Sequence, residues 1–316
     1  MFKANKLKKV LGEKLREHVS MRDFTSIKIG GVCDYFFEAT NVEEIIKAVM
    51  AAREDKMPFF IMGSGSNILV SDYGFGGLVI RNNSGNVAIL PDKSQIIADS
   101  GVNLSQLILK SVNNGLGGLE SLYGIYGTLG GAIYGNAGAY TVEMFNFVKS
   151  VTMLTPENKL VSKNREWFEP SYRESKLKRE KLKDWVILTV KLQLAHNKKE
   201  QLFGNLAKVK TQRDEKLLGL GPSCGSIFRN PKPGKSFKDP KLAKINSAGY
   251  MLEQVEAKKM RVGDAGVFMR HANIIENKGK ASANEVRLLI EEMKSKVHEK
   301  FKKNLVEEIE YVGQWD

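Results

Sequence analysis

Apolar residues recur along the chain with two spacings, which alternate from segment to segment. A spacing of three or four residues is typical of an amphipathic helix, and it predicts helices over 1–20, 104–114, 201–216, 248–255 and 282–301. Short apolar or alternating runs predict strands over 59–62, 77–81, 87–90, 95–99, 148–155 and 185–194. The mixture indicates an α/β or α+β fold.

Both ends of the chain add further elements to this pattern. The segment 25–38 is expected to form a strand, a glycine turn and a second strand. A helix follows, capped by Thr40 or Asn41, and its inner face is predicted to carry Ile45, Ile46, Val49 and Met50. The segment 305–313 predicts one closing strand.

The length of 316 residues and the hydrophobic fraction of 42% are sufficient for two domains with their own cores. We expect an N-terminal helix over 1–20, a first domain over 21–196 and a second over 197–316, because 197–200 is the most polar gap. No apolar run is long enough to cross a membrane, and the N-terminus lacks the features of a secretory signal. A cytoplasmic protein is therefore expected.

The net charge of +13 and the pI near 9.5 are compatible with nucleic-acid binding. The lysines are interleaved with glutamates, as in 176–183 and 294–303, and no arginine-rich arm accompanies them. This distribution favours a solvated basic surface that attracts anionic nucleotides. Cys33 and Cys224 lie far apart with no neighbouring histidine cluster, so neither a disulfide nor a metal site is predicted.

Glycine is concentrated in 124–139, which holds six glycines in sixteen residues. Such a backbone lets main-chain N–H groups approach a ligand, at a cost of about 0.5–1 kcal/mol per glycine relative to alanine. A second glycine-rich loop, Gly63-Ser-Gly-Ser-Asn67, follows a predicted strand, where a pyrophosphate could bind. Ile68 breaks the G-x-G-x-x-G fingerprint, which argues against a nucleotide-binding Rossmann half.

Two glycine loops in one domain favour a flavin dinucleotide over a mononucleotide. The structural alternative is a set of tight turns at a sheet edge. The candidate cofactor-binding residues are Gly63, Ser64, Gly65, Ser66, Asn67, Gly127, Thr128, Gly131, Asn136 and Gly138. Neither loop contains a histidine, so we expect the flavin to be held non-covalently.

Six motifs, in order, resemble the MurB family of UDP-N-acetylenolpyruvoylglucosamine reductases. They include Gly-Thr-Leu-Gly-Gly-Ala-Ile-Tyr-Gly-Asn-Ala-Gly-Ala-Tyr140, Tyr172-Arg-Glu-Ser-Lys-Leu177 and Pro222-Ser-Cys-Gly-Ser-Ile-Phe-Arg-Asn-Pro231. The other three are Thr25-Ser-Ile-Lys-Ile-Gly-Gly31, Gly63-Ser-Gly-Ser-Asn-Ile-Leu-Val70 and Leu305-Val-Glu-Glu-Ile-Glu-Tyr-Val-Gly313. The resemblance implies an α+β protein with a PCMH-type, vanillyl-alcohol-oxidase-like FAD domain and a C-terminal substrate-binding domain.

The reaction that this resemblance implies is the reduction of the enolpyruvyl double bond of UDP-N-acetylglucosamine enolpyruvate, giving UDP-N-acetylmuramate. NADPH reduces FAD, and hydride then adds to one vinyl carbon, so that an enolate needs stabilisation and a proton. The resemblance assigns Arg173 to the enolate, Ser226 to protonation and Glu308 as the catalytic glutamate. Weaker matches to substrate contacts are Tyr172, Lys216, Asn230 and Gln254. Cys224 lacks an activating histidine, and His271 is expected to be structural.

The chain departs from the usual family pattern at Tyr126, Gly135, Thr141 and Glu310. It also lacks the insertion and the tyrosine loop of the longer subclass, so it resembles the shorter type II form. We expect a monomer acting on a small-molecule substrate. The alternatives are a related PCMH-type flavin oxidase of an alcohol or sugar, and a basic RNA- or protein-binding module that has lost the flavin.

Overall fold

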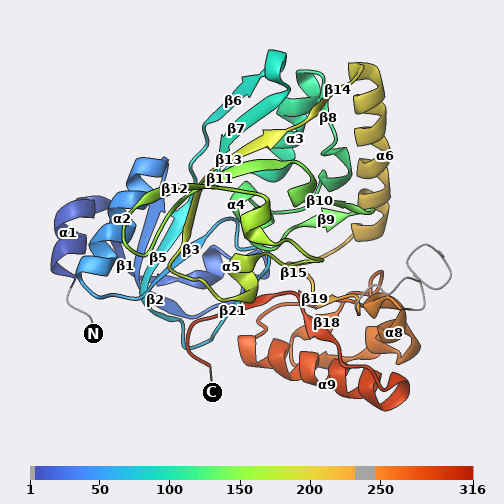
Figure 1. Cartoon of the computed structure of the whole chain (residues 1–316). Helices are drawn as coiled ribbons and strands as arrows, with labels where there is room; N and C mark the ends of the chain where they lie inside the picture. Colours follow the sequence, from blue (N-terminus) through green and yellow to red (C-terminus); the bar gives the residue numbers. More distant parts are fainter. Residues whose placement is uncertain (1–3, 232–245, 316) are drawn as a thin grey trace. The chain divides into compact units, whose positions relative to one another are not determined.

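The chain folds into two compact units, shown in the computed structural model of Figure 1, which describes residues 4–231 and 246–315. Unit 1 comprises the residues up to His18, Asp34–Ser64 and Gly77–Asp214. Unit 2 comprises Val19–Cys33, Gly65–Gly76 and the residues from Glu215 onwards. This division differs from the boundary predicted at 197–200, because unit 2 takes two segments from the N-terminal part of the chain.

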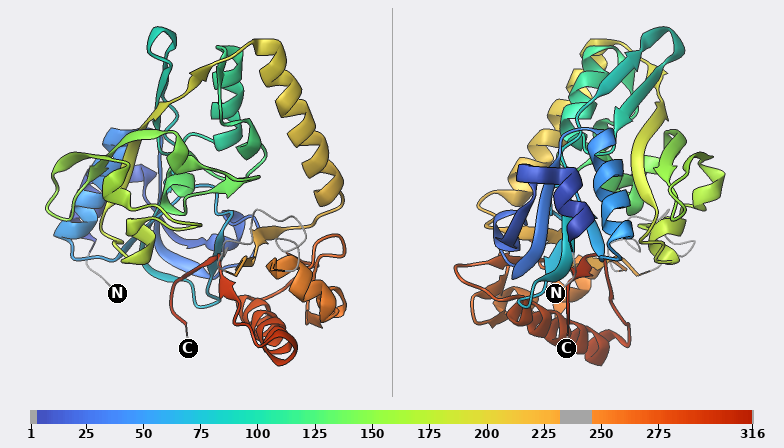
Figure 2. Two further views of the ribbon diagram at one scale, coloured as in Figure 1. Left: turned by 45° about the vertical axis from the view of Figure 1, so that its right-hand side comes forward. Right: turned by 90° about the vertical axis from the view of Figure 1, so that its left-hand side faces the viewer.

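Unit 1 contains a five-stranded antiparallel sheet in the order β12-β11-β13-β7-β6 (Figure 1, Figure 2). Its strands are β6 (Val87–Leu90), β7 (Gln95–Asp99), β11 (Val148–Leu154), β12 (Leu160–Asn164) and β13 (Val186–Gln193). The helices α3 (Leu104–Asn113) and α4 (Leu129–Tyr134) share one hydrophobic core with this sheet. The strands β6, β7, β11 and β13 and the helix α3 confirm elements that the apolar pattern predicts, whereas β12 was not predicted.

A second sheet of unit 1 has the order β1-β2-β5-β3, in which β3 (Phe59–Met62) pairs parallel with β5 (Phe75–Asn82). The other strands are β1 (Arg16–Ser20) and β2 (Val32–Ala39). Helix α2 (Val42–Glu54) begins where the Asn41 side chain accepts a hydrogen bond from the Glu44 N–H at 2.9 Å. Its inner face buries Ile45 and Val49, whereas Met50, predicted to point inward, is exposed.

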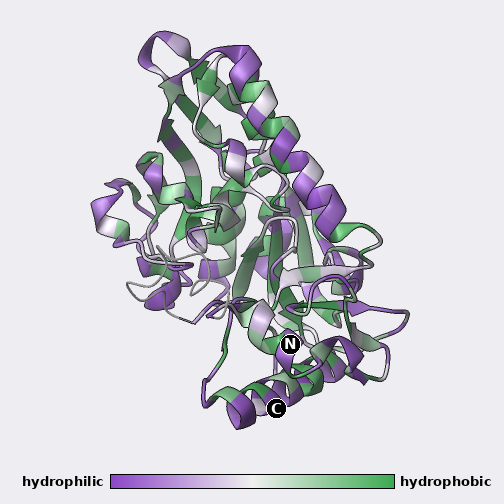
Figure 3. Cartoon of the chain, turned by 90° about the vertical axis from the view of Figure 1, so that its right-hand side faces the viewer, coloured by the Kyte–Doolittle hydropathy of each residue, from purple (hydrophilic) through white to green (hydrophobic). Residues whose placement is uncertain are grey.

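The remaining elements of unit 1 are short, apart from α6 (Lys199–Leu217). They are α1 (Asn5–Leu11), α5 (Lys176–Arg179), β8 (Leu116–Gly117), β14 (Ala195–His196), β9 (Gly138–Ala139) and β10 (Val142–Glu143). Helix α6 buries only Leu202 and Leu206 and is hydrophilic over most of its surface (Figure 3). It therefore joins the core of unit 1 along one narrow stripe.

Unit 2 is built around a four-stranded sheet in the order β15-β19-β18-β17. Its strands are β15 (Ser223–Ser226), β17 (Arg261–Val262), β18 (Ala265–Val267) and β19 (Ile274–Asn277). The helices α8 (Ala248–Gln254) and α9 (Ala283–Phe301) contribute to its core. The predicted apolar stripe of α9 is confirmed from Val286 to Val297, because Val286, Leu289, Ile290, Met293 and Val297 are all buried.

Two strand pairs complete unit 2: β16 (Phe228–Arg229) pairs antiparallel with β20 (Val306–Glu307), and β4 (Ile68–Val70) pairs parallel with β21 (Glu310–Val312). The closing segment is thus two strands, and not the one continuous strand that the pattern predicts. The chain leaves the first pairing at Glu308, whose N–H donates to the Ile227 carbonyl at 2.7 Å.

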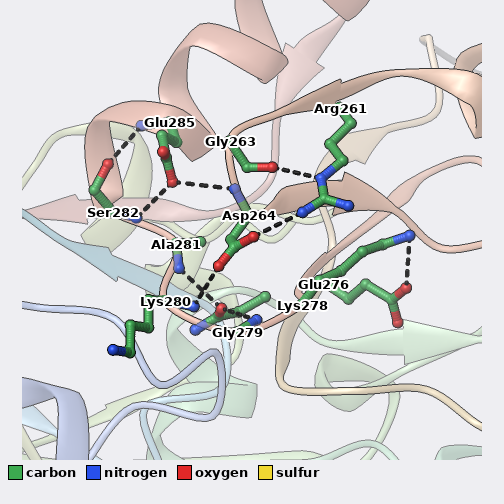
Figure 4. A network of polar contacts seen from close by, with 11 residues as sticks. Arg261, Gly263, Asp264, Glu276, Lys278, Gly279, Lys280, Ala281, Ser282 and Glu285 are labelled. Atoms are coloured by element: carbon green, nitrogen blue, oxygen red, sulfur yellow. Dashed lines mark hydrogen bonds and ion pairs between the residues drawn. The ribbon is translucent and has the colours of Figure 1, made fainter.

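The start of α9 is fixed by a network of polar contacts (Figure 4). The Ser282 hydroxyl accepts from the Glu285 N–H at 3.1 Å, and the Glu285 carboxylate accepts from the Ser282 N–H at 3.0 Å, which together form a capping box. Asp264 accepts from the Lys280 N–H at 2.8 Å. Asp72 accepts from two further N–H groups of this first turn, so the segment after the first glycine loop is tied to α9.

The N-terminal predictions over 1–20 and 25–29 are wrong. The helix ends after Leu11 because Gly12 adopts φ 54°, and Arg16–Ser20 forms β1 instead. In place of a first strand over 25–29, the Thr25 hydroxyl bonds both the carbonyl and the N–H of Ile29, at 2.7 and 3.2 Å. Those bonds satisfy main-chain groups that a neighbouring strand would otherwise satisfy.

Among the described residues, none of the helices is both long and apolar enough to cross a membrane. Over 4–231 and 246–315, no group of three or more His, Cys, Asp and Glu side chains is arranged to hold a metal ion.

Candidate active site

The two glycine-rich loops meet within unit 1 at Gly63 and Thr128. A Cβ placed on Gly63, which directly follows β3, would lie 2.3 Å from Thr128 Oγ1 and 2.7 Å from its Cγ2. Real Cβ atoms do not approach other atoms so closely, so only glycine fits at position 63. The remainder of the first loop, from Gly65 to Asn67, belongs to unit 2.

Some glycines of the second loop lie where an added Cβ would collide with neighbouring protein atoms, whereas others lie where an added Cβ would have open space. A Cβ on Gly130 would lie 2.9 Å from the Ser100 Cβ, and one on Gly138 would lie 2.7 Å from Arg173 Nη1. A Cβ on Gly131 or Gly135, by contrast, would meet no described protein atom nearer than 3.7 Å. These last two positions leave an open backbone surface beside the Thr128 cap of α4.

Asn136 is buried, and its side chain is engaged within the protein. Its amide nitrogen donates to Glu143 Oε2 at 2.9 Å and to the Ser171 carbonyl at 2.8 Å. Its amide oxygen accepts from the Phe145 N–H at 3.2 Å. These bonds tie the second glycine loop to the turn that carries Tyr172 and Arg173. The Asn136 side chain therefore holds this loop in place through contacts with the protein.

Arg173 lies at the end of the second glycine loop. Its Nη2 donates to the Gly138 carbonyl at 2.5 Å, and its guanidinium carbon is 4.8 Å from the centre of the Tyr172 ring. The residue adopts φ 58°, a conformation that few non-glycine residues take and that is frequent at functional sites. Unit 1 therefore brings Gly138, Tyr172 and Arg173 together.

Sequence reasoning missed Arg213, which α6 places against the second glycine loop. A Cβ on Gly124, which has φ 79°, would lie 2.7 Å from Arg213 Cδ. The Arg213 Nη2 donates to the Ser121 carbonyl at 3.3 Å, while Nε is buried without a hydrogen-bond partner among the described residues. Burial lowers the pKa of this guanidinium, and Tyr140 and Tyr126 act in the opposite direction. The sequence contained one signal for Arg213: it lies seven residues after the buried Leu206, a helical spacing that places both residues on the same face of α6.

Unit 2 holds Ser226 at the end of β15. The register of β15 against β19 shifts between Ser223 and Ser226, and Gly225 within this irregularity has φ 79°. Irregularities of this kind re-aim a side chain next to active sites. A Cβ on Gly225 would meet no described atom nearer than the Ser66 carbonyl at 3.9 Å, so the backbone before Ser226 is open.

The main chain of Glu308 is bonded to Ile227, the residue after Ser226, and to the side chain of Asn67. The Glu308 N–H donates to the carbonyl of Ile227, and the Glu308 carbonyl accepts from Asn67 Nδ2 at 3.1 Å. The Glu310 N–H donates to the Asn67 carbonyl at 2.9 Å. Unit 2 thus joins the segment around Glu308 both to Asn67 of the first glycine loop and to Ile227, the residue after Ser226.

The competing glutamates near the C-terminus have other partners. Glu307 forms an ion pair with Lys294 of α9 at 3.1 Å, and Glu299 accepts from the Ser295 hydroxyl at 3.1 Å. Burial raises the pKa of Tyr311 well above its usual value, and the neighbouring Glu307 carboxylate acts in the same direction. Glu307 is therefore engaged with α9.

A pocket of about 210 Å³ in unit 2 is lined by Ser247, Gly249, Tyr250, Glu253, Arg270, His271 and Ala272. Its residues were not predicted, apart from His271, for which a structural role was expected. Of the predicted substrate residues, Asn230 accepts from the Ala248 N–H at 3.0 Å, at the start of α8. Gln254 is exposed at the end of α8, and the charge of Lys216 acts on His271.

His271 has a pKa lowered to about 4, chiefly by burial and secondly by the charge of Lys216. The unfolded chain would bind a proton near pH 6.5, so the unfolded state holds more protons between these values. We expect the contribution of His271 to stability to be complete above pH 6.5 and to be lost as the pH falls toward 4. Urea unfolding at pH 7.5, 5.5 and 4.5 measures this. The His271→Asn variant should lose less stability on acidification than the parent, and parallel losses would contradict the assignment.

Cys224 is buried, and burial raises the pKa of its thiol to about 12. A thiol with such a pKa stays protonated at neutral pH and is a poor nucleophile. This agrees with the sequence argument against nucleophilic catalysis by Cys224.

Comparisons with known proteins identify the family to which the chain belongs. A model of the C-terminal domain of UDP-N-acetylenolpyruvoylglucosamine reductase matches residues 215–312, and a model of an FAD binding domain matches 33–163. The chain is 33% identical over 311 residues to the UDP-N-acetylenolpyruvoylglucosamine reductase of Clostridium novyi (strain NT), covering 98% of this chain and 96% of that one. The chain belongs to the UDP-N-acetylenolpyruvoylglucosamine reductase family.

Further members of this reductase family match at similar levels. The enzyme of Caldicellulosiruptor saccharolyticus is 36% identical over 298 residues, covering 94% of this chain and 91% of that protein. The crystal structure of the MurB reductase from Thermus caldophilus has 28% identity and a TM-score of 0.75, covering 94% of this chain and 99% of that one. The predicted α+β fold with an FAD-binding domain is confirmed, and the match of the C-terminal reductase domain argues against the flavin-oxidase alternative.

Proposed function

We propose that this chain reduces the enolpyruvyl double bond of UDP-N-acetylglucosamine enolpyruvate with NADPH, giving UDP-N-acetylmuramate for peptidoglycan synthesis. The observation that carries the proposal is its likeness to curated reductases over 98% of its length. The convergence of Ser226, Glu308 and Asn67 within unit 2 supports it, because a proton donor and a carboxyl group are both needed beside the reacting carbon.

Unit 1 has features that fit a phosphate-bearing flavin. The missing side chains of Gly131 and Gly135 leave space that no described protein atom fills. Beside the same loop, Arg213 presents a buried Nε without a partner among the described residues, and burying a cation is costly unless it is paired. We assign Gly63, Ser64, Gly65, Ser66, Asn67, Gly127, Thr128, Gly131, Asn136 and Gly138 to non-covalent FAD binding. Most act through their backbone, whereas the Asn136 side chain orders the loop.

When bound, FAD supplies the hydride that it receives from NADPH. The residues of the chain then manage the charge and the proton that hydride addition leaves behind. The Arg173 guanidinium is assigned to stabilise negative charge on the carboxylate side of the former double bond. The Ser226 hydroxyl donates its proton to the carbon beside that carboxylate, and the Glu308 carboxyl returns a proton to the serine oxygen.

Substrate binding is assigned to Tyr172, Lys216, Asn230 and Gln254. Arg270 and His271, which line the pocket of unit 2, are added to this set. The charge of Lys216 acts on His271, and Arg270 Nη1 donates to the carbonyl of Glu215, the residue before Lys216, at 3.4 Å. The proposal extends to a monomeric enzyme in the cytoplasm that acts on a nucleotide-linked sugar and not on nucleic acid. The surplus of basic residues would then serve to attract the anionic nucleotides.

An anaerobic stopped-flow measurement tests the function. The purified protein is expected to show flavin absorbance bands that NADPH bleaches, and the enolpyruvyl UDP-sugar is expected to restore them rapidly. Recovery should not follow the addition of UDP-N-acetylglucosamine, which lacks the double bond. Bleaching without recovery on adding the enolpyruvyl sugar would overturn the proposed substrate. A protein without flavin bands would overturn the flavoenzyme assignment altogether.

A further inference from the structure

Glu307, Lys294 and Tyr311 form a polar cluster next to Glu308 for which the proposed reaction has no use. Lys294 Nζ lies 3.1 Å from Glu307 Oε1 and 2.8 Å from Glu291 Oε1. Burial and then the neighbouring Glu307 carboxylate raise the pKa of Tyr311, whose ring packs edge-on against Trp315 with centroids 5.0 Å apart. The cluster therefore joins both closing strands of unit 2 to α9.

We propose that the cluster of Glu307, Lys294 and Tyr311 is a positioning device that fixes the direction and the charge environment of the Glu308 carboxyl group. This inference rests on the proposed function, because it assumes that Glu308 takes part in the proton transfer.

The geometric part of the argument starts from the break between β20 and β21. A residue between two strands has no ladder to set its side-chain direction. The Glu308 main chain is bonded on both sides, by its N–H to Ile227 and by its carbonyl to Asn67. Ile309 is buried on one side, and on the other the Glu307 side chain is held by Lys294 and Tyr311. With both neighbours anchored, rotation of the segment about Glu308 is prevented.

The electrostatic part of the argument follows from the position of Glu307 directly before Glu308 in the chain. Glu307 is largely buried, with 18% of its side chain exposed, and in such surroundings a charge acts on its neighbours with little screening. Lys294 neutralises Glu307 and so keeps a like charge from acting on Glu308. The charged or titratable groups described in this part of unit 2 include Cys224 on β15, Arg229 on β16, Glu310 and Tyr311 on β21, and Arg287, Glu291 and Lys294 on α9.

Two substitutions that change the charge in opposite directions test the device. Lys294→Met leaves Glu307 unneutralised and should raise the apparent pKa of sugar-dependent flavin reoxidation by about half a unit to one unit. Glu307→Gln removes a negative charge beside Glu308 and leaves Lys294 paired with Glu291 alone, so it should lower the apparent pKa. Both should slow reoxidation at neutral pH by about tenfold through looser positioning. Lys296→Met, the same charge change on the exposed face of α9, should change neither.

The readout is the rate of reoxidation against pH in the anaerobic stopped-flow assay, with NADPH-dependent bleaching as the internal control. Shifts of opposite sign, with bleaching unchanged, would support the inference. Shifts of the same sign, equal loss of both half-reactions, or profiles matching that of Lys296→Met would overturn it.

Tyr311→Phe changes no charge. It should slow reoxidation, with an apparent pKa closer to that of the parent than those of Lys294→Met and Glu307→Gln. An unchanged rate would show that Tyr311 is not part of the device. Absence of sugar-dependent reoxidation in the parent protein would instead overturn the proposed function.

Discussion

Replacing Ser226 with alanine is expected to slow sugar-dependent flavin reoxidation by about 10²–10⁴-fold, the range over which a positioned general acid contributes. Flavin bleaching by NADPH should stay within a small factor of the parent, because the serine hydroxyl is needed only when the substrate carbon takes a proton. The two half-reactions are measured separately by anaerobic stopped-flow absorbance. The large difference between them distinguishes loss of a proton donor from loss of the fold.

Ser223→Ala provides the matched control for this experiment. Ser223 is on the same strand, β15, and pairs with Glu276 across the sheet. Ser226 lies beyond the register shift and directly before Ile227, whose carbonyl accepts from the Glu308 N–H. The control should retain both half-reactions. If Ser226→Ala reoxidises at the parent rate, another group supplies the proton; if it bleaches as slowly as it reoxidises, the loss is structural.

Much of the fold could be predicted from the sequence wherever its determinants are local. Helix α9 is specified by an apolar stripe and by Ser282 with Glu285 three residues later, and both are visible without a structure. The strands β6 and β7 were likewise placed at their observed limits. The helix predicted over 1–20 failed because one glycine at φ 54° ends it, and apolar spacing alone does not reveal a turn.

The candidate site was predictable only where motifs carried it. Arg173, Ser226 and Glu308 came from the family resemblance, whereas apolar alternation could not separate Glu307 from Glu308. That alternation assumes one strand, and the break at Glu308 depends on bonds from Ile227 and Asn67, which lie far away in the sequence. Arg213 was missed for a related reason. A lone arginine in a charged helix is usually a surface residue, and only the structure shows that Gly124 packs against this one.

Replacing Gly63 with alanine is expected to yield a protein that binds little or no flavin. The added Cβ would lie 2.3 Å from Thr128 Oγ1, so the two glycine-rich loops must separate within unit 1. The change should cost about 1–3 kcal/mol of stability, as expected for inserting a methyl group into a packed site. Flavin content is measured from the ratio of absorbance at the flavin band to that at 280 nm, and stability by urea unfolding.

A compensating substitution makes the cause of this loss testable. In the double variant Gly63→Ala with Thr128→Gly, the clashing side chain is gone, and glycine is an acceptable N-cap for α4 at a cost of a few tenths of a kcal/mol. Flavin content should therefore recover relative to Gly63→Ala alone. Gly204→Ala, on the exposed face of α6 with no atom within 4 Å of the added Cβ, should keep full flavin content. The double variant could instead stay colourless while folding normally. That result would mean that Thr128 itself or the backbone of Gly63 contacts the cofactor. Steric separation of the loops would then not be the reason that position 63 requires glycine.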